Sequence, residues 1–171
     1  MNPSASEEIV TADGLAAFLS ATVDHLVTIG ARDEALAVRK PSRGIAALRT
    51  PESMRPVGRA WRLGVLLIER DGSVSAAGKI TRAVRPGWAQ NLSASVEARR
   101  SDRLAASRGK FDDGEVVNYE FTPVSLDIAQ LEAGSGPLLL RDGGVLVRWS
   151  EAGYRPLAPY VTDRIEMLMA D

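Results

Sequence analysis

The chain has 171 residues, of which 45% are hydrophobic and 25% charged, with a formal net charge of −1. This composition is typical of a globular protein that buries a core, and it excludes an intrinsically disordered chain. No apolar run approaches the roughly 18 residues of a membrane span, the start lacks the features of a secretory signal, and cysteine is absent. We therefore expect a cytoplasmic protein without disulfides or thiolate chemistry.

The charges are segregated along the chain. Residues 1–38 carry −5, residues 39–110 carry +11 and residues 111–171 carry −7. Either the basic and acidic elements neutralise each other within the fold, or the middle of the chain presents a basic surface to an anionic partner.

The first elements are an acidic segment and a helix. Residues 1–11 are polar, and we predict that they are disordered. Asp13 can cap a helix that runs to Ile29 and ends at Gly30. Its apolar residues recur at helical spacing and predict a buried face: Leu15, Phe18, Leu19, Thr22, Leu26 and Ile29. Residues 35–39 and 45–49 favour short strands, although the first of these is also a good helix sequence.

The clearest signal follows in GRAWRLGVLLIERDGSVSAAGKITR, residues 58–82. Asp71-Gly72 is a strong two-residue hairpin signal. The hairpin it predicts places Arg70 opposite Ser73 and Trp61 opposite Arg82. Five cations then gather at the open end: Arg59, Arg62, Lys79, Arg82 and Arg85.

The second half predicts alternating helices and strands. We expect a surface helix over 92–108 with Arg99 and Arg103 on one face and a strand at 117–121. One or two helical turns follow, capped by Ser125 and stopped by Gly134. A second hairpin follows around Asp142-Gly143 or Gly143-Gly144, and a helix over 159–169 closes the chain.

Together these elements predict one α+β domain over residues 12–171. An antiparallel, curved sheet of five to seven strands carries flanking helices at the N-terminus, in the middle and at the C-terminus.

Motifs for catalysis are weak. The one histidine, His25, lies at the edge of a helix face, and no G-x-S-x-G elbow or Gly-rich phosphate loop occurs. The acidic run 112–115 lacks the spacing of a calcium loop. Ser107-x-x-Lys110 formally matches S-x-x-K but falls at a helix end. The sequence therefore predicts no metal site and no cofactor.

The segments VGRAWRLGVLL, GKITRA and VRWS followed by GYRPLAPY resemble a small uncharacterised protein family of actinobacteria. The resemblance covers about residues 55–170, and the arginine-rich composition is typical of a GC-rich bacterial genome. Some members of that family carry a glutaminase label, which implies a small amidohydrolase. The resemblance puts no residue of this chain into a catalytic role.

From the sequence we expect a cytoplasmic binding or interaction domain without recognisable catalytic machinery. Two alternatives remain open: an amidohydrolase, and an anion or nucleic-acid binder that uses residues 39–110. The low aromatic content, 5%, disfavours nucleic acid. A homo-oligomer is left open. The candidate anion-binding residues are Arg59, Arg62, Lys79, Arg82, Arg85, Arg99 and Arg103.

Overall fold

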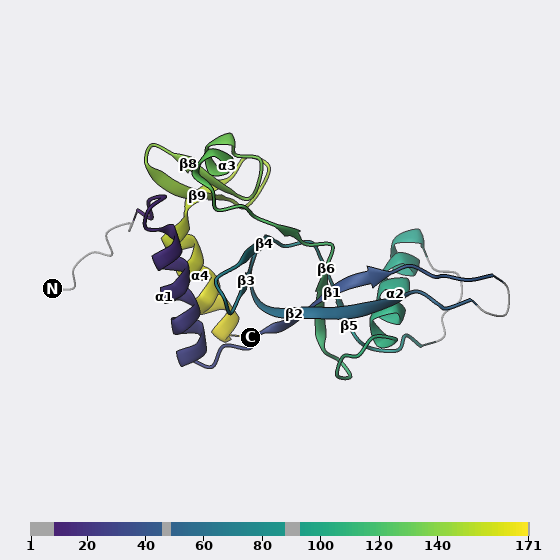
Figure 1. Ribbon diagram of the computed structural model, residues 1–171. Coiled ribbons are helices and arrows are strands. Elements are labelled where there is room, and N and C mark those ends of the chain that lie inside the picture. The colour runs from purple at the N-terminus through teal and green to yellow at the C-terminus, as the bar shows by residue number, and fades with distance from the viewer. Residues whose placement is uncertain (1–8, 46–48, 88–92, 171) are drawn as a thin grey trace. The chain divides into compact units, whose positions relative to one another are not determined.

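The structure is a computed structural model, and it describes residues 9–45, 49–87 and 93–170 (Figure 1). The fold is α+β, as the sequence predicts. A seven-stranded sheet has the order β5-β6-β1-β2-β3-β4-β7, and a three-stranded sheet has the order β10-β9-β8. The elements are α1 (Leu15–Thr28), β1 (Glu34–Lys40), β2 (Ser53–Leu63), β3 (Leu66–Glu69), β4 (Val74–Ala76), β5 (Lys79–Arg82), α2 (Ala94–Ser107), β6 (Val116–Tyr119), β7 (Thr122–Pro123), α3 (Ile128–Ala133), β8 (Leu138–Arg141), β9 (Gly144–Arg148), β10 (Tyr154–Pro156) and α4 (Leu157–Ala170).

The chain forms two compact units, each with its own core. Unit 1 comprises residues 1–32, 61–76 and 122–171, and unit 2 comprises residues 33–60 and 77–121. Unit 2 holds 14 basic and nine acidic residues, a net charge of +5, whereas unit 1 carries −6. Most of the basic middle segment therefore belongs to one folded unit.

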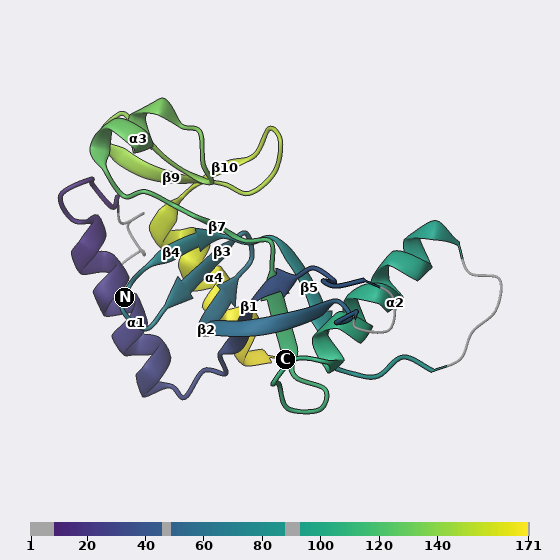
Figure 2. The same cartoon turned by 45° about the vertical axis from the view of Figure 1, so that its right-hand side comes forward.

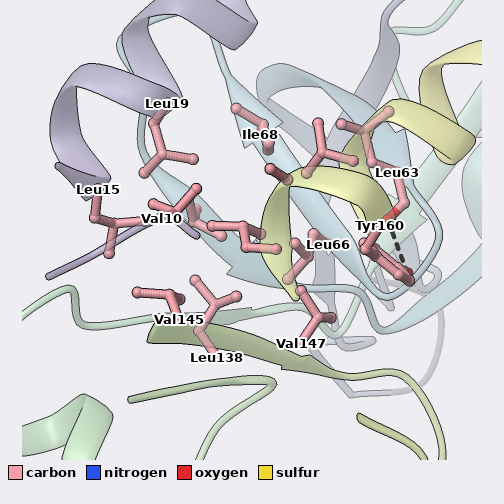
Figure 3. Close-up of a cluster of buried hydrophobic side chains, with 14 of the residues drawn as sticks. Val10, Leu15, Leu19, Leu63, Leu66, Ile68, Leu138, Val145, Val147 and Tyr160 are labelled. Atoms are coloured by element: carbon pink, nitrogen blue, oxygen red, sulfur yellow. Dashed lines mark hydrogen bonds between the residues drawn. The ribbon is translucent and has the colours of Figure 1, made fainter. Parts of the chain in front are cut away.

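The core of unit 1 confirms the predicted apolar face of the first helix. The buried residues of α1 are Leu15, Leu19, Thr22, Val23 and Leu26. They pack with β3, β9 and α4 in one apolar cluster (Figure 3). The helix begins differently from the prediction: its N-cap is Gly14, whose N–H donates to the Thr11 hydroxyl at 3.2 Å, and Asp13 does not cap it.

The segment before α1 is described from Ile9 onward, and residues 1–8 lie outside the described residues. Val10 is buried, and its carbonyl accepts a hydrogen bond from the Val145 N–H at 2.7 Å. This contact joins the segment to β9.

The predicted hairpin around Asp71-Gly72 forms, but the predicted strand register and the predicted loop length of two residues are wrong. Leu67 lies opposite Ser75, and the loop has three residues because the Glu69 N–H donates to the Ser73 carbonyl. Gly72 has φ +85°, as the residue of a hairpin bulge requires. This extra loop residue shifts the register by one position and exchanges the two faces of the strand.

The predicted long strand also breaks at Gly64, which has φ +65°. Here β2 ends and β3 begins, so β5 no longer pairs with β2 and instead pairs with β6. A Cβ at Gly64 would lie 2.2 Å from the Tyr160 hydroxyl. That hydroxyl accepts the Val65 N–H at 3.0 Å and donates to the Leu63 carbonyl at 3.2 Å (Figure 3). Tyr160 thus satisfies the buried Leu63 carbonyl and the partly buried Val65 N–H of the turn.

We predict that Tyr160→Phe destabilises the protein by about 1–3 kcal/mol, because the buried Leu63 carbonyl and the partly buried Val65 N–H lose their partner. Chemical denaturation measures the loss. Tyr154→Phe is the control, since Tyr154 is 46% exposed, and we expect it to be neutral. Equal stability of the two variants would contradict this role for the Tyr160 hydroxyl.

The second hairpin and the remaining helices of unit 1 agree closely with the sequence. Leu138 lies opposite Val147 and Arg141 opposite Gly144, so Asp142-Gly143 is the two-residue turn. Both turn residues have positive φ, +49° and +78°. Figure 2 shows α3 beside this small sheet. The helix ends at Gly134, as predicted, but its N-cap is Asp127 and not Ser125. The last helix begins two residues earlier than predicted, at Leu157.

Unit 2 holds the strands β5, β6 and β1 and most of β2. The prediction of an antiparallel sheet is wrong at one place, since β1 and β6 pair in parallel, with Ala35 opposite Val117. The predicted strand at 117–121 breaks at Glu120, which has φ +55°. The predicted strand at 45–49 falls partly on residues 46–48, outside the described residues; next to them Arg43 and Thr50 form a bridge.

The core of unit 2 is small and built largely from alanines. Ala105 and Ala106 of α2 are buried with residues of the sheet: Ala35, Ala37, Met54, Ala83, Val117 and Tyr119. Short side chains let the helix approach the strands closely, and the charged side chains of α2 then border this contact. No helix within the described ranges is long and apolar enough to cross a membrane.

Candidate anion-binding site

The structure does not gather the predicted cations into one rim. Arg62 belongs to unit 1, and the other six belong to unit 2. Because β5 pairs with β6, Arg59 of β2 and Arg82 of β5 are separated by two strands, β6 and β1. Arg85 follows β5 and is exposed.

Two of these cations are neutralised by acidic residues of the same unit. Arg59 forms ion pairs with Asp33 at 2.7 Å and with Glu115 at 2.5 Å. These hydrogen bonds outweigh burial and raise the pKa of Arg59. Lys79 pairs with Glu120 at 2.7 Å. For Arg59 and Lys79, the geometry therefore fits the first interpretation of the charge segregation, in which basic and acidic elements neutralise each other within the fold.

Three other predicted cations meet in a pocket of about 310 Å³. Arg82 comes from β5, and Arg99 and Arg103 come from α2, where their spacing of four residues places them on one face. Two carboxylates also line this pocket. Its lining residues are Glu34, Ile80, Thr81, Arg82, Arg99, Asp102, Arg103 and Val116. We call it the arginine pocket.

The arginines of this pocket are not neutralised by its carboxylates. Within residues 9–45, 49–87 and 93–170, no ion pair joins Arg82, Arg99 or Arg103 to any acidic group. Arg82 donates one hydrogen bond, to the Gly114 carbonyl at 3.3 Å. The three guanidinium groups therefore keep donor capacity for a further partner.

The position of α2 depends on Arg39 of β1. The Arg39 guanidinium binds Glu52 at 2.7 Å and also Asp102 of α2, and it lies over the ring of Tyr119. Burial disfavours its charge, but the hydrogen bonds and charges of Glu52 and Asp102 outweigh this cost and raise the pKa of Arg39. Its Nε is buried without a partner among the described residues. The guanidinium thus bridges Glu52 and Asp102 with one hydrogen bond to each, and the bond to Asp102 orients the helix face of Arg99 and Arg103.

The second carboxylate of the pocket is held by an amide. The Asn118 Nδ2 donates to Glu34 Oε2 at 2.7 Å, and Asn118 is fully buried in β6. Sequence reasoning missed both Glu34 and Asp102 as site residues. One signal was present: Asn118 interrupts an apolar strand, and a buried polar residue requires a partner.

Other residues considered for chemistry lie apart from this pocket. His25 is exposed on α1, Ser107 is the last residue of α2 and donates to the Leu104 carbonyl, and residues 112–115 form a turn. Among the described residues, no group of three or more histidine, aspartate or glutamate side chains could hold a metal ion. Comparison with family models, curated proteins and solved structures found no match for the chain.

The network beneath the pocket makes a pH-dependent contribution to stability. Burial, followed by the hydrogen bond and charge of Asp102, raises the pKa of the Tyr119 hydroxyl. The unfolded state loses this proton near the ordinary value of about 10, while the folded state retains it. The stabilisation is therefore present below about pH 10 and is lost as the pH rises above it.

We predict that the free energy of unfolding falls less steeply above about pH 10 in Tyr119→Phe than in the parent, because the titrating hydroxyl is absent. Denaturation between about pH 8 and 11 measures both slopes. Tyr154→Phe serves as the control and should follow the parent. If the free energy of unfolding falls equally steeply with pH in Tyr119→Phe and the parent, Tyr119 has the same pKa in the folded and unfolded states, and the prediction is wrong.

Proposed function

We propose that this protein is a binding module that holds an oxyanion in the arginine pocket. One observation carries the proposal: three arginines from two elements line one pocket, and the described part of the chain provides none of them with an ion-pair partner. The three side chains are exposed, and the two carboxylates of the pocket are bound by other residues, so an added anion can offset the charge of the arginines. A phosphate, sulfate or carboxylate group supplies that charge and accepts several N–H donors at once.

The basic balance of unit 2 supports the same proposal. A net charge of +5 on this unit attracts an anionic ligand over a distance of about one Debye length, roughly 8 Å at physiological salt. Ile80 and Val116 add apolar surface at the pocket wall. The glutaminase label, by contrast, rests on the resemblance alone, and no specific side-chain arrangement favours an amidase reaction here.

Thermal unfolding with added inorganic phosphate tests the proposal. A ligand that binds only the folded state stabilises it by about 2.7 kcal/mol at 100 times the Kd. We predict that phosphate raises the Tm of the parent and has little effect on the variant Arg99→Gln/Arg103→Gln. Without ligand, that variant should be as stable as the parent or more stable, because the repulsion between the arginines is reduced.

The matched control is Arg55→Gln/Arg141→Gln, which removes the same charge from exposed positions outside the pocket. All titrations are made at constant ionic strength, because salt screens every charge interaction. Equal protection of the parent and Arg99→Gln/Arg103→Gln by phosphate would refute the proposal.

A further inference from the structure

The arginine pocket contains two acceptors as well as three donors. Glu34 and Asp102 line the same pocket as Arg82, Arg99 and Arg103. At neutral pH a carboxylate is an acceptor only, with two oxygens and about four lone-pair positions. A fully deprotonated anion placed between the arginines therefore meets repulsion from these two groups. An anion that still carries a proton can donate a hydrogen bond to one of these carboxylates, and this bond offsets part of the repulsion.

Glu34 has the greater free acceptor capacity of the two. Asp102 is bound by the Arg39 guanidinium and by the Tyr119 hydroxyl. Glu34 Oε2 accepts one hydrogen bond, from the Asn118 amide at 2.7 Å, and no cation pairs with Glu34 in the described ranges. Because Asn118 is fully buried, it holds the Glu34 carboxylate in place before any ligand arrives.

We propose that the arginine pocket selects a protonated oxyanion, the hydrogen phosphate group, and that Glu34 is the residue that determines this selectivity. The inference rests on the proposed function. The ligand's P–O–H donates to Glu34, while its unprotonated oxygens accept N–H bonds from the arginines. Sulfate has the same shape and charge as hydrogen phosphate but carries no proton at neutral pH, so it cannot donate a hydrogen bond to Glu34 and is excluded.

The same chemistry excludes phosphodiesters. A diester keeps its negative charge but has no P–O–H, so it leaves the Glu34 carboxylate beside an anion without a hydrogen bond between them. The backbone of nucleic acid is a phosphodiester. We therefore infer that duplex DNA does not compete for this pocket, although the unit that holds the pocket is basic.

Competing oxyanions test the selectivity. The apparent Kd for phosphate, sulfate and dimethyl phosphate is obtained from the dependence of Tm on ligand concentration, at pH 7 and constant ionic strength. A hydrogen bond to a charged group changes affinity about tenfold or more. We expect phosphate to bind the parent at least about tenfold more tightly than either proton-free anion.

Glu34→Gln identifies the residue responsible. The oxygen of the introduced amide can still accept from Asn118, while its NH₂ group can donate to sulfate, so we expect phosphate and sulfate to bind this variant within about threefold of each other. Glu97→Gln on α2 removes the same charge outside the pocket and should keep the parental preference. A phosphate monoester carries a P–O–H only while its second pKa, about 6, is not exceeded. Titration of glycerol phosphate at pH 6 therefore tests whether the pocket takes a phosphorylated ligand as well as free phosphate.

The outcomes separate the two proposals. If phosphate and sulfate protect the parent equally, selectivity is refuted and oxyanion binding stands. If the preference persists in Glu34→Gln, the assignment to Glu34 is refuted. If no anion protects the parent, both proposals fail. The comparison of phosphate with sulfate needs no variant, so it remains decisive even if Glu34→Gln does not fold.

Discussion

The ion-pair contacts of Arg39 are the constraint on which unit 2 depends. A guanidinium on β1 that binds Glu52 and Asp102 joins a helix to the sheet through directional bonds. The apolar contact beneath α2 consists mainly of alanine methyl groups, which fix the separation of helix and sheet but specify the rotation of the helix poorly. Arg39 supplies that specification. The contact between Arg39 and Asp102 therefore sets the rotation at which Arg99 and Arg103 face β5.

Under the proposed function, the charges of unit 2 serve structure and ligand binding at different positions. Arg59 and Lys79 are neutralised by acidic neighbours and act in the fold. Arg82, Arg99 and Arg103 line a pocket beside two carboxylates that have other partners. Acidic groups in a basic pocket lower the affinity for every anion but raise discrimination between anions. Such an arrangement is useful where several oxyanions of similar size compete.

The sequence predicted the features that depend on local spacing. The apolar face of α1, the Asp142-Gly143 turn and the shared face of Arg99 and Arg103 all follow from residues within a few positions of each other. Non-local pairings could not be predicted. Glu34 and Asn118 are 84 positions apart, and the parallel pairing of β1 with β6 brings them together. Gly64 was misleading because a glycine in an apolar run is compatible with a continuous strand as well as with a turn.

The division of the chain between its two units has a consequence for biosynthesis. Every residue of unit 2 has been made once the ribosome passes residue 121, whereas the core of unit 1 lacks β9 and α4 until near the end. Until then the apolar faces of α1 and β3 have no complete core to enter, and such exposed surfaces are prone to aggregation. Nascent chains that stop before α4 therefore still expose this apolar surface, although all residues of the arginine pocket have already been made.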